Sequence, residues 1–262
     1  VHRRQVLSEE IGAIKRKKGR PTRDYQREKL VIELAKSHAK ELNVDPEMVV
    51  DLMQLLIQSS LKTQESARVK EEGQGNGKRA LVIGGLGRMG GWFAEFMSMQ
   101  GYEVHIADIN IQEEDESHFN SWRDTDDSYD ITVLATPLRQ SIEILENILE
   151  SGRRGIIFDI ASIKSPIKEL LKEISDKGMK VTSIHPMFGP DTDLLTGKHV
   201  VFMNIDSHDT HLEIMKLFES TTAQMIEMSI DSHDYAISYV LGLSHIINIA
   251  FSKVLHDSGE KN

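Results

Sequence analysis

The stretch Ala80-Leu81-Val82-Ile83-Gly84-Gly85-Leu86-Gly87-Arg88-Met89-Gly90-Gly91 decides the fold of this chain of 262 residues. Its first four residues form a short apolar run, which is typical of a buried parallel strand. The glycines that follow have the spacing G-x-G-x-x-G. We expect Gly85 to permit a tight turn, Gly87 to let a pyrophosphate approach the backbone, and Gly90 to let the next helix pack on the strand. The predicted dinucleotide contacts are Gly85, Leu86, Gly87, Arg88, Met89 and Gly90.

An acidic residue supports the same site. Asp108 ends the next apolar run, about 20 residues after the glycines, where a carboxylate can accept both hydroxyls of an adenosine ribose. It would repel a 2′-phosphate, and no Arg or Lys follows within residues 109–111. We therefore predict NAD as the cofactor in preference to NADP. A glycine turn with only a structural role is the alternative, and the order strand, glycines, helix, strand, acid disfavours it.

Composition excludes several classes of function. The formal net charge of −10 argues against a general nucleic-acid role. No segment is expected to approach a transmembrane span or a secretory signal. The chain has no cysteine and no histidine cluster with metal-ligand spacing, so we predict no disulfide, no metal site and a cytoplasmic location. Because the chain starts at Val1 and its last apolar helix lacks a clear stop, we expect a longer protein.

The N-terminal residues carry no strand signal and predict three helices, over about residues 1–17, 22–43 and 46–69. Asp45 is the expected N-cap of the third helix, with Pro46 at its first helical position. The polar, glycine-rich residues 70–78 have no periodicity, which is typical of a linker. We therefore predict an all-α N-terminal domain over residues 1–69.

Strand and helix patterns alternate after the linker. Strands are predicted near residues 80–84, 103–108, 130–135, 155–160, 179–184, 198–203 and 224–228, and helices near 88–100, 138–150, 164–176 and 208–219. This alternation predicts a doubly wound, Rossmann-type α/β domain over residues 79–230. A last helix near 231–256 is too apolar for a surface helix. It predicts that residues 231–262 begin a helical dimerisation domain.

Polar residues interrupt the apolar stripes of the three N-terminal helices. They are Arg4, Lys15, Asp24, Arg27, Glu28, Ser60 and Gln64. If the stripes face one interior, these groups need partners, because buried charges are costly unless they are paired or ligated. An anionic ligand with hydroxyl groups would satisfy them. The alternative, which spacing alone favours, is a set of solvated faces.

Distinctive residues follow three of the predicted strands, at the sheet edge where the ligands of such folds bind. They lie in Ala135-Thr136-Pro137, in Asp159-Ile160-Ala161-Ser162-Ile163-Lys164 and in Ser183-Ile184-His185-Pro186-Met187-Phe188-Gly189-Pro190-Asp191. His185 leaves a buried strand for a loop with two prolines, where a histidine can act as a general base. Ser162, one strand away, could fix its tautomer. A packed histidine in a structural proline loop is the alternative.

The N-terminal residues resemble the all-helical chorismate mutase family. The resemblance rests on Arg4-x-x-Leu7-x-x-x-Ile11-Gly12-x-x-Lys15, Arg20-Pro21-x-Arg23-Asp24-x-x-Arg27-Glu28 and Ser60-x-x-x-Gln64. It implies a site between two intertwined protomers that rearranges chorismate to prephenate without a nucleophile or a metal. Arg4 and Lys15 would bind carboxylates, and Lys15 and Gln64 would donate to the ether oxygen. Asp24, Arg27, Glu28 and Ser60 would hold the ring carboxylate and hydroxyl region. The family's first helix is longer, and the Arg that its early part supplies across the dimer is absent here.

The remaining motifs resemble prephenate dehydrogenase. They are Gly-Gly-x-Gly-x-Met-Gly, Asp-x-Ala-Ser-x-Lys and His-Pro-Met-Phe-Gly-Pro-Asp. The resemblance implies NAD-dependent oxidative decarboxylation of prephenate to 4-hydroxyphenylpyruvate in tyrosine biosynthesis. His185 would take the proton of the substrate 4-hydroxyl and Ser162 would hold His185. The Thr136-Pro137 turn would lie by the nicotinamide. The family often uses an Arg of its helical domain to hold a substrate carboxylate. The matching helix here has no Arg, so either His245 would hold this carboxylate or the Arg would lie beyond Asn262.

Together the two resemblances imply a homodimeric, bifunctional chorismate mutase–prephenate dehydrogenase. Two other interpretations remain. Another Rossmann-type dehydrogenase of small hydroxy acids would need a catalytic Lys on a helix after the sheet. A non-catalytic, NAD-sensing module with a decayed mutase domain would bind NAD without turning over prephenate.

Overall fold

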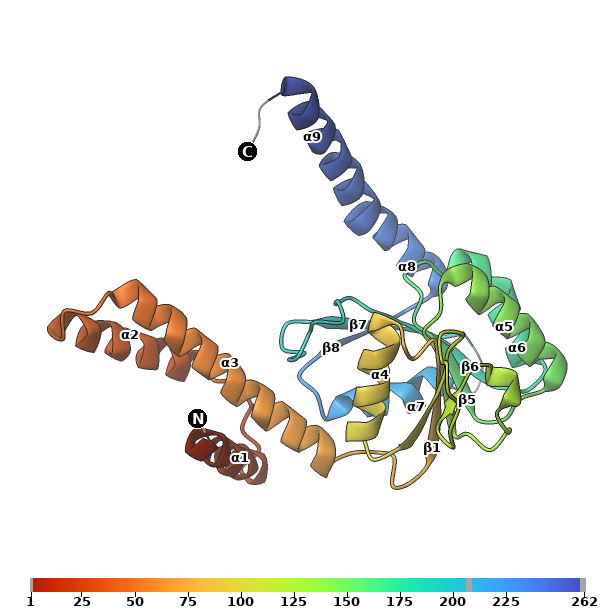
Figure 1. Cartoon of the computed structure of the whole chain (residues 1–262), viewed down its shortest axis with the longest axis horizontal. Helices are drawn as coiled ribbons and strands as arrows, with labels where there is room; N and C mark the ends of the chain where they lie inside the picture. The colour runs from red at the N-terminus through yellow and green to blue at the C-terminus, as the bar shows by residue number, and fades with distance from the viewer. Residues whose placement is uncertain (1, 206–208, 260–262) are drawn as a thin grey trace.

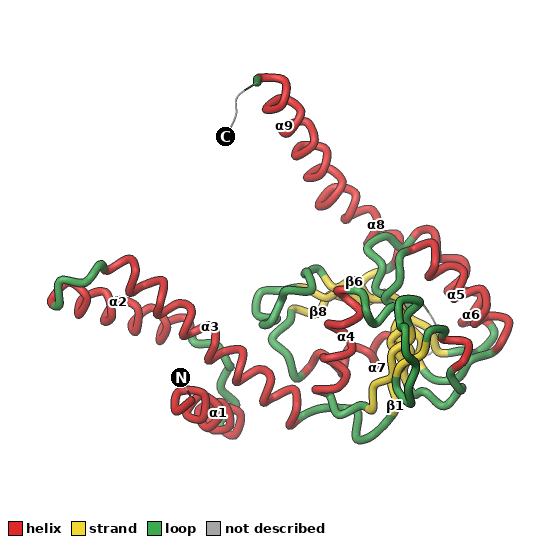
Figure 2. The backbone as a smooth tube through the Cα atoms, viewed as in Figure 1, coloured by secondary structure: helices red, strands yellow, loops and turns green. Residues whose placement is uncertain are grey.

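The computed structural model describes residues 2–205 and 209–259 of the chain. Three helices at the N-terminus form an extended arm, a β-sheet covered by helices forms the body, and the last helix projects away from the body (Figure 1). Figure 2 shows that the strands are confined to the body, between the helical arm and the projecting helix. The predicted division into a helical and an α/β region, followed by a further helix, is confirmed.

The arm consists of α1 (His2–Lys17), α2 (Tyr25–Glu41) and α3 (Pro46–Glu71). Asp24 caps α2 by accepting a hydrogen bond from the backbone of Arg27, and Asp45 caps α3 by accepting one from Glu47. Both α1 and α2 pack on α3. The three predicted helices are thus present, with ends that differ from the predicted ends by a few residues.

The body contains an eight-stranded sheet in the order β3-β2-β1-β4-β5-β6-β7-β8. Its strands are β1 (Arg79–Ile83), β2 (Glu103–Ala107), β3 (His118–Phe119), β4 (Ile131–Leu134), β5 (Ile156–Asp159), β6 (Lys180–Pro186), β7 (His199–Met203) and β8 (Gln224–Met228). All neighbouring pairs are parallel except β6 and β7, which are antiparallel. The strand order reverses between β1 and β4, and this switch point is where α/β sheets bind ligands.

Helices cover both faces of the sheet. They are α4 (Arg88–Met99), α5 (Leu138–Ser151), α6 (Lys168–Asp176) and α7 (Thr210–Glu219), with a 3-10 turn η2 (Ser165–Ile167) before α6. One core cluster contains Phe93 of α4 and Phe218 of α7. The other contains Leu145 of α5 and Leu171 of α6. The four helices therefore pack as two pairs on opposite faces. Residue 208, where the predicted helix 208–219 begins, lies outside the described residues.

The predicted linker is ordered against the body. The helix α3 continues to Glu71, and the amides of Gly75 and Gly77 donate hydrogen bonds to the carbonyls of Gln100 and Gly101. A Cβ atom at Gly73 would lie 2.4 Å from the carbonyl oxygen of Gln100, so the glycine lets two backbones approach. The glycines of this segment thus allow close packing, and the boundaries of the linker stay a prediction.

The acidic segment after Asp108 contains structure that its sequence does not signal. It includes the short strand β3 and a 3-10 turn, η1 (Trp122–Asp124). A strand of two residues is too short to show alternation, so its pairing with β2 depends on tertiary contacts.

The last helix has three parts, α8 (Ile230–Ile237), a π-helical segment η3 (Ser238–Leu243) and α9 (Ser244–Ser258). Its apolar side chains are exposed, with Ile246 at 65% and Phe251 at 62%. The helix from Ile230 to Ser258 is long and apolar enough to cross a membrane, so the prediction that no segment approaches such a span is wrong by length and composition. One such helix is weak evidence for a membrane protein, because helices that pack against protein can share this composition.

Candidate active sites

The glycine turn between β1 and α4 is shaped by close backbone contacts. A Cβ atom at Gly90 would lie 2.0 Å from the carbonyl oxygen of Gly84, and one at Gly85 would lie 2.5 Å from the side chain of Ile106. The residue with a positive φ angle, 83°, is Gly84 and not Gly85. The tight turn assigned to Gly85 therefore belongs to Gly84, whereas Gly85 provides space beside β2.

The start of α4 is suited to a phosphate group. Its N-cap, Gly87, has no side chain and forms no side-chain cap, so the first amides of the helix remain available to an anion. Asp108 lies beside the turn, because one of its oxygens accepts a hydrogen bond of 3.1 Å from the amide of Leu86. The residues present therefore fit a dinucleotide, with amides and a helix dipole for its phosphates and a carboxylate for a ribose.

Thr136 and Pro137 lie at the switch point, next to the glycine turn. Pro137 is the N-cap of α5, and the Thr136 hydroxyl is 2.9 Å from the hydroxyl of Ser141. A Cβ atom at Gly84 would lie 3.0 Å from Thr136 Cγ2. The structure thus places this turn at the carboxyl end of β4, beside the glycine turn that follows β1.

His185 lies on β6 and begins a chain of hydrogen bonds between buried side chains. Its Nδ1 atom is 2.8 Å from Nε2 of His233, and Nδ1 of His233 is 2.7 Å from the carboxylate of Asp234. Asp234 also accepts hydrogen bonds from the amides of Lys164 and Ser165 and from the Ser165 hydroxyl. His233 and Asp234 belong to α8, so the last helix contributes to a site on the sheet.

The network determines which nitrogen of His185 is free. Asp234 accepts every one of its hydrogen bonds, which is the pattern of an ionised carboxylate. The neutral His233 must then carry its proton on Nδ1, and its Nε2 must accept the proton of His185 Nδ1. Nε2 of His185 is therefore the atom that carries the lone pair. Among the described residues it has no hydrogen-bond partner, so it can accept a proton.

Burial keeps the two histidines of this hydrogen-bond network uncharged, whereas Asp234 is ionised. Burial, with the nearby charge of Lys164 and the contact with His233, lowers the pKa of His185 to about 3. Burial also lowers the pKa of His233, against the opposing effect of Asp234. For Asp234, burial raises the pKa, but hydrogen bonds from Ser165 and His233 outweigh it and keep the pKa below its usual value. His185 is thus neutral, and Asp234 can stabilise, through His233, a proton that arrives on His185.

A buried ion pair supports the floor of the site. Lys164 donates to a carboxylate oxygen of Asp159 at 2.7 Å and to the carbonyl of Ile184 at 2.7 Å, and both charged side chains are fully buried. Burial lowers the pKa of Lys164, and the carboxylate of Asp159 opposes this shift. Because Ile184 directly precedes His185 on β6, Lys164 connects the end of β5 to the backbone next to the histidine.

Ser162 and His245, two residues predicted to belong to the dehydrogenase site, lie on the surface of the single chain. Ser162 is exposed and forms no hydrogen bond with His185, and the position beside Nδ1 is taken by His233. His245 is exposed on α9. Sequence reasoning missed His233 and Asp234, although a polar pair at the start of an otherwise apolar helix was a usable signal.

The segment 187–198, which follows His185 and Pro186, folds back over α4. The ring of Phe188 lies 4.9 Å from that of Trp92, and the indole of Trp92 donates to the carbonyl of Thr192 at 2.9 Å. Arg88 of the glycine turn forms a 2.6 Å ion pair with Asp191. The segment after His185 therefore lies beside the glycine turn and the start of α4.

The predicted mutase residues fall into two groups. Arg4 of α1 donates to the hydroxyl of Ser60 at 3.1 Å, and Gln64 lies one helical turn further along α3. Gln64 is 6% exposed, and its side-chain oxygen is buried without a hydrogen-bond partner among the described residues. These three residues thus meet where α1 crosses α3.

The second group lies near the turn between α1 and α2. Lys15 donates to the carbonyl of Thr22 at 2.5 Å, and Glu28 pairs with Arg23 at 3.0 Å. Asp24 and Arg27 are exposed, so the single chain does not enclose all of the predicted residues in one interior. Arg23 belongs to the motif that carries the family resemblance, although it is not among the predicted site residues.

Two family models match the chain. Residues 1–65 match chorismate mutase type II, and residues 96–227 match prephenate dehydrogenase, nucleotide-binding domain. The glycine turn precedes the second match, so its assignment rests on its own geometry.

Two curated relatives cover different shares of the chain. A T-protein of Enterobacter agglomerans is 22% identical over 250 residues, which cover 95% of this chain and 64% of the relative. The probable arogenate/prephenate dehydrogenase of Methanocaldococcus jannaschii is 26% identical over 187 residues, or 67% of this chain and 42% of the relative. The chain thus spans less than two thirds of the length of these relatives.

A solved structure shares the fold. It is the prephenate dehydrogenase from A. aeolicus in complex with hydroxyphenyl propionate and NAD+, with a TM-score of 0.56 and 22% identity over 69% of this chain and 70% of that chain. The second family model covers half of the sequence. The chain therefore belongs to the prephenate dehydrogenase family, and the region before its nucleotide-binding domain matches chorismate mutase type II.

Proposed function

We propose that this chain is the mutase and nucleotide-binding part of a bifunctional enzyme of tyrosine biosynthesis. It would rearrange chorismate to prephenate and convert prephenate, with NAD, to 4-hydroxyphenylpyruvate. The observation that carries the proposal is the chain Asp234–His233–His185, which leaves a lone pair on His185 Nε2. The two family matches and the T-protein relative support both halves of the proposal.

The dehydrogenase step needs a base and a hydride acceptor. The proton of the substrate 4-hydroxyl passes to His185 Nε2, and the positive charge that results is stabilised through His233 by Asp234. NAD supplies the acceptor for the hydride that leaves the same ring carbon. The ring carboxylate leaves as carbon dioxide, its bonding electrons enter the ring, and the ring becomes aromatic. Asp108, the amides of α4 and the Thr136-Pro137 turn would hold the cofactor.

The test uses the full-length protein with prephenate and NAD, with NADH and the keto acid product measured together. His185→Asn should lower kcat about 10²–10⁴-fold while NAD still binds. Binding of NAD without turnover by the unmodified protein would favour the NAD-sensing module. Turnover of a simple hydroxy acid in place of prephenate would favour another Rossmann-type dehydrogenase.

The choice of cofactor has its own test. Because Asp108 would repel a 2′-phosphate, NADP should support much slower turnover than NAD, and Asp108→Ala should narrow the difference. Equal kcat/KM for both cofactors in the unmodified protein would contradict this assignment.

The mutase half is supported by the group Arg4, Ser60 and Gln64. The side-chain oxygen of Gln64 is buried and has no hydrogen-bond partner among the described residues, so this polar atom is left to accept from a donor outside them. Gln64→Ala and Lys15→Ala should each lower the mutase rate by a factor on the order of 10² or more, as for the loss of an oxyanion donor. Turnover of supplied prephenate should barely change. Loss of both activities in a folded Lys15→Ala protein would contradict two separate sites.

A homodimer in the cytoplasm completes the proposal. Apolar side chains are exposed along the arm and the last helix, among them Leu7 (48%), Ile11 (48%), Leu30 (61%), Ile246 (65%) and Ile249 (69%). Such surfaces are typical of protein interfaces. Size-exclusion chromatography with light scattering should give twice the mass of the full-length chain. Recovery of the protein in the membrane fraction would instead favour a membrane-spanning last helix.

A further inference from the structure

A buried carboxylate of the helical arm is bound by the body of the protein. Glu65 of α3 is 5% exposed, and both of its oxygens accept hydrogen bonds from residues more than 100 positions away. One oxygen accepts from the amide of Leu195 at 2.9 Å. The other accepts from the amide of Thr222 at 2.6 Å and from its hydroxyl at 2.5 Å. No ion pair joins Glu65 to a cation within residues 2–205 and 209–259.

The donors belong to two loops that meet beside the arm. Leu195 lies in the segment 187–198, which begins directly after His185 and Pro186. Thr222 precedes β8, and its hydroxyl is 2.7 Å from that of Thr196. Glu65 therefore joins the C-terminal end of the segment 187–198 to the residues just before β8, the edge strand of the sheet. These hydrogen bonds are the ones that a buried carboxylate needs.

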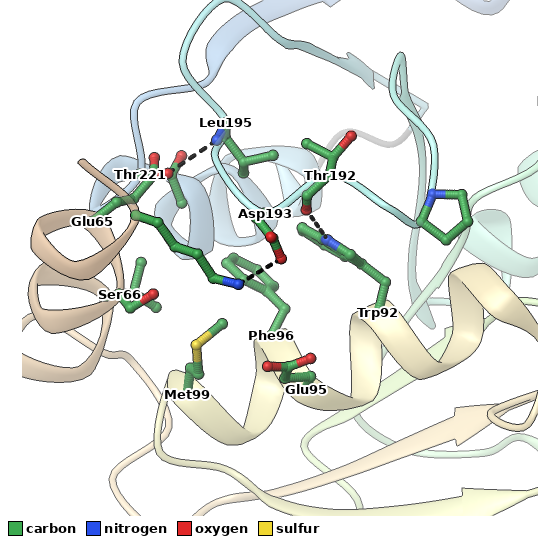
Figure 3. Close-up of a pocket in the computed structure, with 13 residues that line it drawn as sticks. Glu65, Ser66, Trp92, Glu95, Phe96, Met99, Thr192, Asp193, Leu195 and Thr221 are labelled. Carbon is green, nitrogen blue, oxygen red and sulfur yellow. Dashed lines mark hydrogen bonds and ion pairs between the residues drawn. The ribbon is translucent and has the colours of Figure 1, made fainter. Parts of the chain in front are cut away.

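Neighbouring contacts direct the same segment towards α3. Lys62, one turn before Glu65, forms a 2.8 Å ion pair with Asp193. The indole of Trp92 holds the carbonyl of Thr192, and a cavity of about 170 Å³ lies between α3, α4 and this segment (Figure 3). Figure 3 shows Glu65 and Trp92 approaching the segment from two different helices. Residues 192–195 are thus fixed from both sides.

We propose that Glu65 is a positioning residue for the dehydrogenase reaction, because it fixes the segment 187–198, which is the loop that follows the catalytic base. The inference rests on the proposed dehydrogenase function. It makes the mutase-region helix α3 a structural part of the dehydrogenase site. Gln64, the neighbouring residue, faces α1, since a Cβ atom at Gly12 would lie 3.0 Å from its side chain. One turn of α3 therefore serves both regions.

The test compares Glu65→Gln with Glu47→Gln in the full-length protein. Glu47 lies on the same helix, is exposed and pairs with Lys36, so it controls for loss of a carboxylate on α3. In Glu65→Gln, the amide oxygen can still accept hydrogen bonds on one side, but the NH2 group faces the donors on the other side, so one of the two attachments is lost. We expect kcat/KM for prephenate to fall about 10–100-fold, as for a misplaced loop. The mutase rate should stay unchanged, and so should the pH at which kcat/KM for prephenate falls to half of its maximum on the acid side. The hydrogen bonds of Glu65 reach neither the mutase residues nor the network of His185, His233 and Asp234.

Hydrogen exchange provides a readout that does not need activity. In Glu65→Gln the amides of Leu195 and Thr222 should lose protection, while the amides of the sheet keep it. A milder variant, Thr222→Val, removes one donor and should show the same pattern to a smaller degree. If the unmodified protein does not oxidise prephenate, the proposed function fails. If it does, and Glu65→Gln keeps both its kinetics and its exchange pattern, the positioning role of Glu65 is refuted.

Discussion

Replacing His233 tests the orientation of the catalytic base. His233→Leu removes the acceptor that lies 2.8 Å from Nδ1 of His185, a side chain that is only 4% exposed. A buried donor without a partner costs about 1–3 kcal/mol. Because about 1.4 kcal/mol corresponds to a tenfold change in rate, kcat should fall roughly 5- to 150-fold. Activity is lost in those molecules whose His185 imidazole carries its proton on Nε2 or turns away from the substrate.

The assay measures kcat and KM for prephenate at saturating NAD in three variants. In His233→Gln the side-chain amide oxygen can accept the Nδ1 proton, so this variant should recover most of the activity that His233→Leu loses. His256→Leu removes an exposed histidine from the same end of the chain and should leave kcat unchanged. An unchanged kcat in a folded His233→Leu protein, or equal losses in the Leu and Gln variants, would refute an orienting role for His233.

Three further predictions concern the support of the site. Lys164→Met leaves the carboxylate of Asp159 buried without its cation and should lower the free energy of unfolding by about 3–5 kcal/mol in urea, whereas Lys168→Met, which breaks an exposed pair, should not. Because the pKa of His185 is about 3 when folded and 6.5 when free, its contribution to stability is complete above about pH 6.5 and is lost as the pH falls towards 3. In His185→Asn the melting temperature should therefore vary less with pH across this range than in the unmodified protein. Gly90→Ala places a methyl group 2.0 Å from a backbone oxygen and should weaken NAD binding about tenfold or more by calorimetry, whereas Gly91→Ala, with its nearest atom at 3.6 Å, should not.

The sequence predicts the sheet well because its strands are short apolar runs between clear turns. Gly90 could be assigned its packing role from spacing alone, and the structure places it against Gly84. Gly84 could not be distinguished from Gly85, because either glycine could adopt the positive φ angle of the turn. The ends of the helices were less certain, since capping residues allow shifts of one or two positions.

The hydrogen-bond partners of the site were not predictable in the same way. His233 follows His185 by 48 positions, and Glu65 reaches Thr222 across 157 positions. No periodicity relates residues this far apart, so their pairing depends on how the helices dock on the sheet. Of the residues that the family resemblance grouped, Arg4, Ser60 and Gln64 lie together along α1 and α3, whereas Asp24 and Arg27 are exposed in the single chain.

The π-helical segment Ser238–Leu243 allows the last helix to change its length by one residue without turning its apolar surface. A π turn contains one residue more than an α turn, so deleting one residue there would restore a regular α-helix. Because the extra residue is taken up within its own turn, the residues on either side would keep nearly the same orientation. His233 and Asp234 would stay in place, and α9 would present the same apolar face. A deletion within α9 would instead rotate every later residue by about 100°, because each residue of an α-helix accounts for that angle.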